Sequence, residues 1–69
     1  MMRDPVFKVG DKITPRYLSD YHLTMGKAYV VVSYSPPYPD ENFTWPAYVQ
    51  IHDDRGVLVT AHARRFKPV

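Results

Sequence analysis

The 69-residue sequence has no cysteine, and this absence removes two common means of stabilising a small domain. Disulfide bonds cannot form, and thiolate metal sites are excluded as well. A chain of this length is expected to form one domain, residues 1–69, that buries only roughly 60% of its unfolded surface. Closed β topology, dense aromatic side chains or self-association must therefore supply the stability.

Long apolar runs are also missing. The longest, residues 28–32 (AYVVV), is strand-sized and far shorter than the roughly 20 residues that a membrane helix needs. The first ten residues, MMRDPVFKVG, contain no hydrophobic signal region, so we expect neither secretion nor membrane association. We expect a cytoplasmic protein, and the lack of cysteine is compatible with that compartment.

Neither sign of charge dominates the sequence. Nine Lys and Arg residues stand against seven Asp and Glu residues, which gives a net charge of +2. A dedicated nucleic-acid-binding protein usually carries a clearer stripe of positive charge. Net charge therefore says little about the partner of this protein.

Proline, by contrast, is abundant. Seven prolines and three glycines leave no interval for a helix of normal length. The runs between them are short and β-prone, which predicts a small all-β domain. We expect strands at residues 9–14, 28–35, 45–52, 57–60 and 66–69, one helical turn at 61–65 and a flexible N-terminal arm at 1–6. An irregular loop is expected at 15–25, and a proline-rich loop, stiffened toward polyproline geometry, at 35–44.

Two of these strands have informative patterns. Both faces of residues 28–35 begin apolar, which predicts a central strand partly covered on both sides. Residues 45–52 (WPAYVQIH) alternate, so that Trp45, Ala47, Val49 and Ile51 share one face. The expected core consists of Leu23, Tyr29, Val31, Val49, Ile51, Leu58 and Phe66.

Residues 53–56 (DDRG) separate two alternating strands and predict a β-hairpin. Aspartate caps turns through its side chain, and Gly56 supplies the positive φ of a type I turn with a following bulge. We expect the adjacent Asp53 and Asp54 side chains to point apart into water, unlike a catalytic pair held across a cleft. A metal loop would need more oxygen ligands at spaced positions.

The order of the predicted elements resembles an SH3-like barrel. Residues 17–23 resemble its RT loop, residues 35–44 its n-Src loop, residues 53–56 its distal turn and residues 61–65 the single helical turn before its last strand. The resemblance covers about residues 7–69. It implies a small five-stranded SH3-like barrel.

A narrower pattern is similar to that of small proteins of bacteriophages and their hosts, which read roughly L-T-x-G-K-x-Y-x-V, then D-D-x-G, then R-F. Here it occurs as LTMGKAYVV at residues 23–31, DDRG at 53–56 and Arg65-Phe66. The resemblance implies a phage-type protein in the host cytoplasm, and some phage SH3-like proteins bind host proteins. Eukaryotic SH3 domains instead have an acidic RT loop and paired tryptophans, whereas here Pro46 follows Trp45, so recognition of proline-rich peptides is not expected.

Patterns typical of catalysis or metal binding are absent. No serine lies in a nucleophile motif, and there is no glycine-rich phosphate loop. His22, His52 and His62 lack the local ligand spacing of a zinc site. We expect no enzymatic activity, no cofactor and no metal.

Aromatic residues near the two long loops give the leading functional hypothesis. In an SH3-like barrel these loops flank one groove, and aromatic side chains dominate the hot spots of protein interfaces. We expect a host or phage protein to bind this groove, unless some of the rings only cover the ends of the barrel. The candidate partner-binding residues are Tyr17, Tyr21, Tyr38, Phe43 and Trp45.

Two alternatives remain open. The basic C-terminal segment suits nucleic acid, with cations on phosphates and rings on bases. Alternatively, strand edges such as residues 66–69 (FKPV) pair with another copy in a structural or self-assembling role, so we expect a monomer or a weak homo-oligomer. The candidate nucleic-acid contacts are Lys8, Lys12, Arg64, Arg65 and Lys67.

Overall fold

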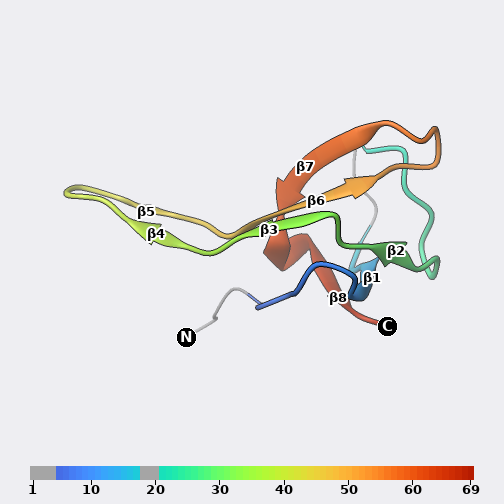
Figure 1. Cartoon of the computed structure of the whole chain (residues 1–69), viewed down its shortest axis with the longest axis horizontal. Coiled ribbons are helices and arrows are strands. Elements are labelled where there is room, and N and C mark those ends of the chain that lie inside the picture. The colour runs from blue at the N-terminus through green and yellow to red at the C-terminus, as the bar shows by residue number, and fades with distance from the viewer. Residues whose placement is uncertain (1–4, 18–20) are drawn as a thin grey trace.

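The computed structural model describes residues 5–17 and 21–69, which leaves most of the expected N-terminal arm and Asp20 outside the described residues. The described chain consists of short strands and one helical turn (Figure 1). The elements are β1 (Lys12–Pro15), β2 (Tyr29–Val30), β3 (Ser33–Ser35), β4 (Tyr38–Pro39), β5 (Thr44–Trp45), β6 (Tyr48–His52), β7 (Leu58–His62), the 3-10 turn η1 (Ala63–Arg65) and β8 (Phe66–Pro68).

Three small antiparallel sheets make up the fold, with the orders β2–β1–β8, β3–β6–β7 and β4–β5. Figure 1 shows β4 and β5 as a ribbon that extends away from the other strands. The expected all-β class is confirmed. The expected five strands appear instead as eight shorter ones, and the sheets of the described chain do not close into a barrel.

The chain passes from one sheet to the other at Val31 and Val32. The Val31 N–H group donates to the Asp11 carbonyl (2.9 Å), beside β1, and the next N–H group, of Val32, donates to the Gln50 carbonyl (2.8 Å) in β6. Because neighbouring residues bond to different sheets, the expected strand at residues 28–35 is bent and divides into β2 and β3. This bend places the two sheets around one core.

Burial along residues 28–35 corrects a second expectation, that this run forms a central strand partly covered on both sides. Val31 is fully buried, whereas Val30 is 52% exposed and Val32 is 39% exposed. β2 and β3 are edge strands of their sheets rather than one central strand. A domain of this size has only two layers, so each strand buries one face.

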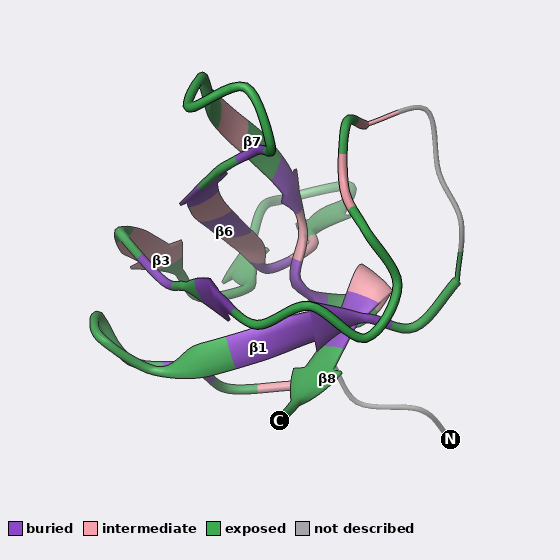
Figure 2. Ribbon diagram, turned by 90° about the vertical axis from the view of Figure 1, so that its right-hand side faces the viewer, coloured by how far each residue is buried: buried purple, intermediate pink, exposed green. Residues whose placement is uncertain are grey.

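The core lies between the two three-stranded sheets, and the alternation of β6 supplies its centre (Figure 2). Ala47, Val49 and Ile51 are completely buried as expected, whereas Trp45 is 49% exposed because it belongs to the projecting ribbon. Leu58 was expected in the core, but it lies at the outer end of β7 and is exposed. The buried apolar residues are Phe7, Ile13, Tyr29, Val31, Ala47, Val49, Ile51, Ala61, Ala63 and Phe66.

The ribbon replaces the stiff proline-rich loop expected at residues 35–44. β3 pairs with β6 up to Ser35 and Tyr48, and the ladder resumes in the same register where Tyr38 pairs with Trp45. The three prolines Pro36, Pro37 and Pro46 lie in the gap between the two ladders. Proline has no N–H group to donate, so it interrupts the ladder without changing the register.

The hairpin expected at residues 53–56 is confirmed. The Gly56 N–H group donates to the Asp53 carbonyl (2.9 Å), the Asp53 N–H group donates to the Val57 carbonyl (2.9 Å), and Gly56 has a φ of 80°. The Asp53 side chain, however, is completely buried rather than pointing into water. Its Oδ1 accepts hydrogen bonds from the N–H groups of Arg55 and Val57, both at 2.9 Å, so it shapes the turn from inside.

Asp54 also has partners instead of facing only water. Its Oδ1 accepts hydrogen bonds from Lys27 Nζ (2.8 Å) and Tyr29 Oη (2.7 Å), and its Oδ2 accepts one from Thr24 Oγ1 (2.7 Å). Tyr29 Oη in turn accepts a hydrogen bond from the Thr24 N–H group (2.7 Å). The spaced motif residues of the sequence therefore form one contact between two turns that are distant along the chain.

Candidate functional site

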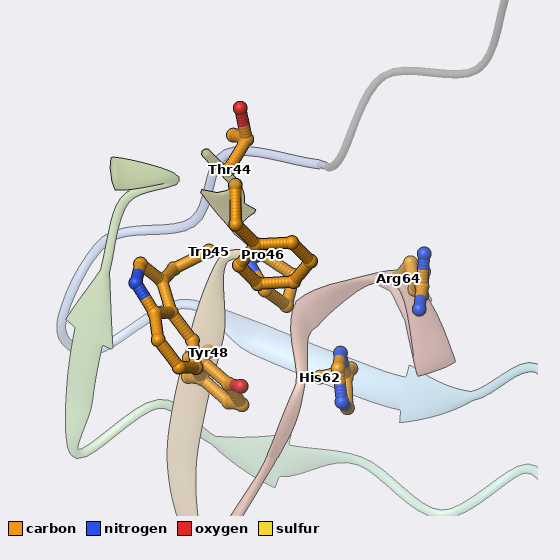
Figure 3. A pocket seen from close by; sticks show the side chains of 7 residues that line it. Thr44, Trp45, Pro46, Tyr48, His62 and Arg64 are labelled. Atoms are coloured by element: carbon orange, nitrogen blue, oxygen red, sulfur yellow. The ribbon is translucent and has the colours of Figure 1, made fainter. Parts of the chain in front are cut away.

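A pocket of about 290 Å³ opens where the ribbon joins the body of the protein (Figure 3). Its walls come from β5, β6, β7 and η1, so four elements meet around it. We call it the aromatic pocket, and its lining residues are Phe43, Thr44, Trp45, Pro46, Tyr48, His62 and Arg64.

The strand pattern explains why these side chains face the pocket. Val49 points into the core, so its neighbour Tyr48 points to the opposite face of β6. His62 of β7 lies directly opposite Tyr48, and their ring centroids are 4.9 Å apart. On the ribbon, the rings of Phe43 and Trp45 pack edge to face with centroids 5.0 Å apart.

The two sides of the pocket differ in chemistry. In Figure 3 the rings of Trp45 and Tyr48 lie on one side, and the side chains of His62 and Arg64 lie on the other. No carboxylate lines the pocket, and Arg64 forms no ion pair with any described residue. The aromatic pocket therefore combines an apolar wall with an unpaired cation.

His62 contributes a side-chain nitrogen that has no hydrogen-bond partner among the described residues. Its Nδ1 is buried and makes no hydrogen bond within the described chain. A buried polar group without a hydrogen bond costs on the order of 1–3 kcal/mol. Because the atom is buried, a ligand in the pocket reaches it only if the imidazole ring turns.

The expected groove between the two long loops is divided in the structure. Phe43 and Trp45 line the aromatic pocket, whereas Tyr17 and Tyr21 lie around Arg65, whose guanidinium carbon is 5.9 Å from the Tyr17 ring centroid and 5.7 Å from that of Tyr21. Such distances are typical of cation–π contacts. The five candidate partner-binding residues are thus not brought together in one site.

Tyr21 and Tyr38 occupy different environments. Tyr21 packs against the core, and its hydroxyl donates to the Thr60 carbonyl of β7 (3.2 Å), so it holds the long loop to the sheet. Tyr38 is opposite Trp45 in the ribbon and is 66% exposed, but it does not line the aromatic pocket.

The candidate nucleic-acid contacts are also spread over several elements. Arg64 lines the aromatic pocket, and Arg65 contacts the two tyrosines of the loop. Lys12 and Lys67 lie on one face of the β2–β1–β8 sheet, because Lys67 is opposite Thr14, two residues after Lys12. Lys8 lies in the preceding turn, where its carbonyl accepts a hydrogen bond from the Asp11 N–H group.

A second pocket, of about 390 Å³, lies beside β2 and is lined by Lys27, Ala28, Tyr29, Val30, Val32, His52 and Asp53. Its charged groups already have partners, since Lys27 binds Asp54 and Asp53 binds Arg55. In the part of the chain that the structure describes, the arginine of the aromatic pocket has no ion pair and a nitrogen of its imidazole has no hydrogen bond, so this pocket is the better candidate for a binding site.

The two turn carboxylates have similar electrostatics. Hydrogen bonds from Lys27, Thr24 and Tyr29 lower the pKa of Asp54 to about 2. Burial opposes the ionised form of Asp53, but the Arg55 side chain and the N–H groups of Val57 and Arg55 outweigh it and lower its pKa as well. An acid–base pair would instead have its two pKa values pushed apart.

No protein-family model, curated protein or solved structure matches this chain. Within residues 5–17 and 21–69, no three His, Asp or Glu side chains gather as metal ligands, and no helix is long and apolar enough to cross a membrane. The geometry of the aromatic pocket is therefore the feature of this chain that points to a function.

Sequence reasoning missed Thr44, Pro46, Tyr48 and His62 as pocket residues. A signal for Tyr48 was present, because it alternates with the buried Val49 and therefore had to face outward. The sequence presents His62 as a candidate metal ligand and as part of the basic C-terminal run, not as a pocket residue. Its position opposite Tyr48 follows from the register of β6 and β7, which the predicted turn at residues 53–56 sets, so a signal for His62 was present as well.

Proposed function

We propose that this protein is a non-enzymatic binding module of the SH3-like type, which binds a host or phage protein through the aromatic pocket. The observation that carries the proposal is the pocket itself: three aromatic rings and a proline next to an arginine that has no ionic partner among the described residues. Aromatic and arginine side chains of this kind are enriched among interface hot spots.

The order of elements supports the SH3-like assignment. The first strand, β1, pairs with the last strand, β8, and with β2, the first half of the bent strand. The second half of the bent strand, β3, belongs to the β3–β6–β7 sheet. A single 3-10 turn precedes the last strand. The β4–β5 ribbon then occupies the place of the n-Src loop and the hairpin at residues 53–56 that of the distal turn.

The size of the pocket favours a protein partner over a small molecule. About 290 Å³ lies at the lower end of the range for small-molecule sites, which span roughly 300–1,000 Å³. A space of this size holds one or two side chains of a peptide. The resemblance to small bacteriophage proteins directs the search for that peptide to host or phage proteins.

The proposal is tested with Trp45→Ala, which removes the apolar wall of the pocket. The matched control is Tyr17→Ala, because Tyr17 is 50% exposed, like Trp45 at 49%, but lies outside the pocket. Each variant is immobilised and used to capture partners from nuclease-treated bacterial host lysate, and the affinity for the purified partner is then measured. We expect Trp45→Ala to weaken binding by about 30-fold, as for a hot spot, and Tyr17→Ala to have little effect.

Equal capture by the wild-type protein and Trp45→Ala would contradict the proposal, provided that circular dichroism shows both to be folded. Loss of the captured protein after nuclease treatment would also contradict it. That result would indicate that nucleic acid bridges the two proteins.

Nucleic-acid binding is the second candidate, and the position of Arg64 beside the aromatic rings favours it. A base can stack on a ring while the guanidinium contacts a phosphate. Binding of this kind weakens steeply with salt because counterions are released. A gel-shift titration at two salt concentrations with a single-stranded oligonucleotide distinguishes it from peptide binding.

A further inference from the structure

We propose that the aromatic pocket recognises an extended peptide segment in which a carboxylate side chain is adjacent to an aromatic or proline side chain. This inference rests on the proposed function and names the chemistry of the partner. The ring would enter between Trp45 and Tyr48, and the carboxylate would bind Arg64.

The charge of the pocket favours an anionic ligand. Arg64 is exposed and has no ionic partner among the described residues, and none of the seven lining residues is acidic. The neighbouring Arg65 differs, because the rings of Tyr17 and Tyr21 lie on it. Of these two adjacent arginines, Arg64 is the one available to a carboxylate, and an arginine–carboxylate contact is often bidentate.

The position of His62 beside Arg64 strengthens the preference for an anionic ligand. It lies on the same side of the pocket as Arg64, and its buried Nδ1 makes no hydrogen bond within the described chain. Rotation of the half-buried ring would bring an imidazole N–H group to the second oxygen of a carboxylate bound by Arg64. The two groups form an anion-binding side that faces an apolar side.

The shape of the charge distribution favours a carboxylate over a nucleic-acid backbone. A backbone needs a track of several cations, because each phosphate contact adds to the affinity. Lys12 and Lys67 lie in the β2–β1–β8 sheet, away from the pocket. The basic side chains among the described residues that line the pocket are Arg64 and His62. One arginine beside one imidazole suits a single anionic group.

The experiment uses the fluorescence of Trp45, which is the only tryptophan of the chain and lines the pocket. The probes are two hexapeptides with blocked ends and without tryptophan. One contains phenylalanine followed by glutamate, and the other has glutamine in place of glutamate. We expect the acidic peptide to bind at least 10-fold more tightly than its amide counterpart.

The variants Arg64→Gln and His62→Gln test the anion-binding side, and Lys67→Gln is the matched control that removes one cation outside the pocket. We expect Arg64→Gln to abolish the preference for the acidic peptide, His62→Gln to reduce it, and Lys67→Gln to retain it. All three variants keep Trp45 as the reporter. Circular dichroism confirms that each variant is folded.

The outcomes separate this inference from the proposed function. If both peptides bind equally and Arg64→Gln changes nothing, the carboxylate inference is overturned, but peptide binding at the pocket remains. If neither peptide changes the emission up to millimolar concentration while an oligonucleotide does, the proposed function is overturned as well.

Self-association is the remaining outcome. The tip of the ribbon contains Asp40 and Glu41 between aromatic residues, so a second copy also offers an acidic segment of this composition. If analytical ultracentrifugation shows a dimer that both Arg64→Gln and an excess of the acidic peptide dissociate, the occupant is a second copy. The assignment to a separate protein partner is then overturned.

Discussion

At the scale of single residues, the adjacent carboxylates Asp53 and Asp54 have different structural roles. Asp53 is buried and holds the turn through backbone N–H groups, whereas Asp54 receives hydrogen bonds from residues on another turn. The turn itself is predictable, because Asp and Gly favour it locally. The contacts of Asp54 are not predictable in this way, because Thr24 and Lys27 lie 30 and 27 residues away in sequence.

The pKa of Asp54 leads to a prediction about acid stability. In the folded protein this pKa is about 2, below its ordinary value of 3.8, so the ionised carboxylate stabilises the fold. This contribution is present above about pH 4 and is lost as the pH falls from 4 toward 2. We expect Asp54→Asn to lower the free energy of unfolding at pH 7 and the difference from wild type to shrink toward pH 2.

Urea unfolding at several pH values between 2 and 7 measures this effect. The control is Asp40→Asn, because the Asp40 side chain accepts a hydrogen bond only from the neighbouring Glu41 N–H group in the described structure. We expect the control to follow the wild-type pH dependence. A difference between Asp54→Asn and wild type that stays constant down to pH 2 would contradict this role.

At the scale of elements, the ribbon formed by β4 and β5 contributes no strand residue to the core of the described chain. Both strands have two residues, all of them exposed, including Tyr38 and Trp45. A two-stranded ribbon is marginally stable by itself in water. Its register continues that of β3 and β6, but the prolines between the two ladders interrupt the hydrogen bonds that would join them.

Hydrogen exchange should reveal this difference. The Asp40 amide donates to the Phe43 carbonyl (2.7 Å) in the ribbon, and the Val32 amide donates to the Gln50 carbonyl (2.8 Å) in the body. Because the ribbon opens without disturbing the core, we expect the Asp40 amide to exchange faster by on the order of 100-fold or more. NMR exchange measurements on the free protein test this expectation.

Addition of the peptide ligand provides the control for the exchange measurement. Binding at the aromatic pocket should slow exchange at the ribbon more than at Val32, because Phe43 and Trp45 line the pocket. Equal protection of both amides in the free protein would argue against a ribbon that opens independently.

At the scale of the whole molecule, two sheets share one core through the bent strand. The two-residue period of the strand buries Val31 and turns Val30 and Val32 to solvent, and the chain changes sheets between Val31 and Val32. The domain has few other large side chains to fill its centre, since three of the ten buried apolar residues are alanine. A small core of this kind leaves little stability in reserve.

Substitution of neighbouring valines tests this arrangement. We expect Val31→Ala to lower the free energy of unfolding by about 2 kcal/mol, because it removes buried methyl groups and leaves a cavity. Val30→Ala removes the same atoms from an exposed position and should cost less than about 1 kcal/mol. Chemical denaturation of both variants measures the difference, and equal losses would contradict the burial of Val31 in the core.

The sequence by itself determined the features that depend on neighbouring residues. Prolines exclude long helices, the DDRG segment specifies the turn with Gly56, and the alternation of β6 places Val49 and Ile51 inside. These features follow from local backbone preferences and from the two-residue period of a strand.

Only the tertiary structure decided which distant residues meet. It divided the AYVVVSYS run between two sheets, paired Asp54 with Lys27, and turned an expected loop into a ribbon that carries Trp45 to the aromatic pocket. It also separated Tyr17 and Tyr21 from that pocket and placed Tyr48 and His62 there instead. The physical reason is that such contacts depend on strand register and on which faces the small core can cover, and both are properties of the whole chain.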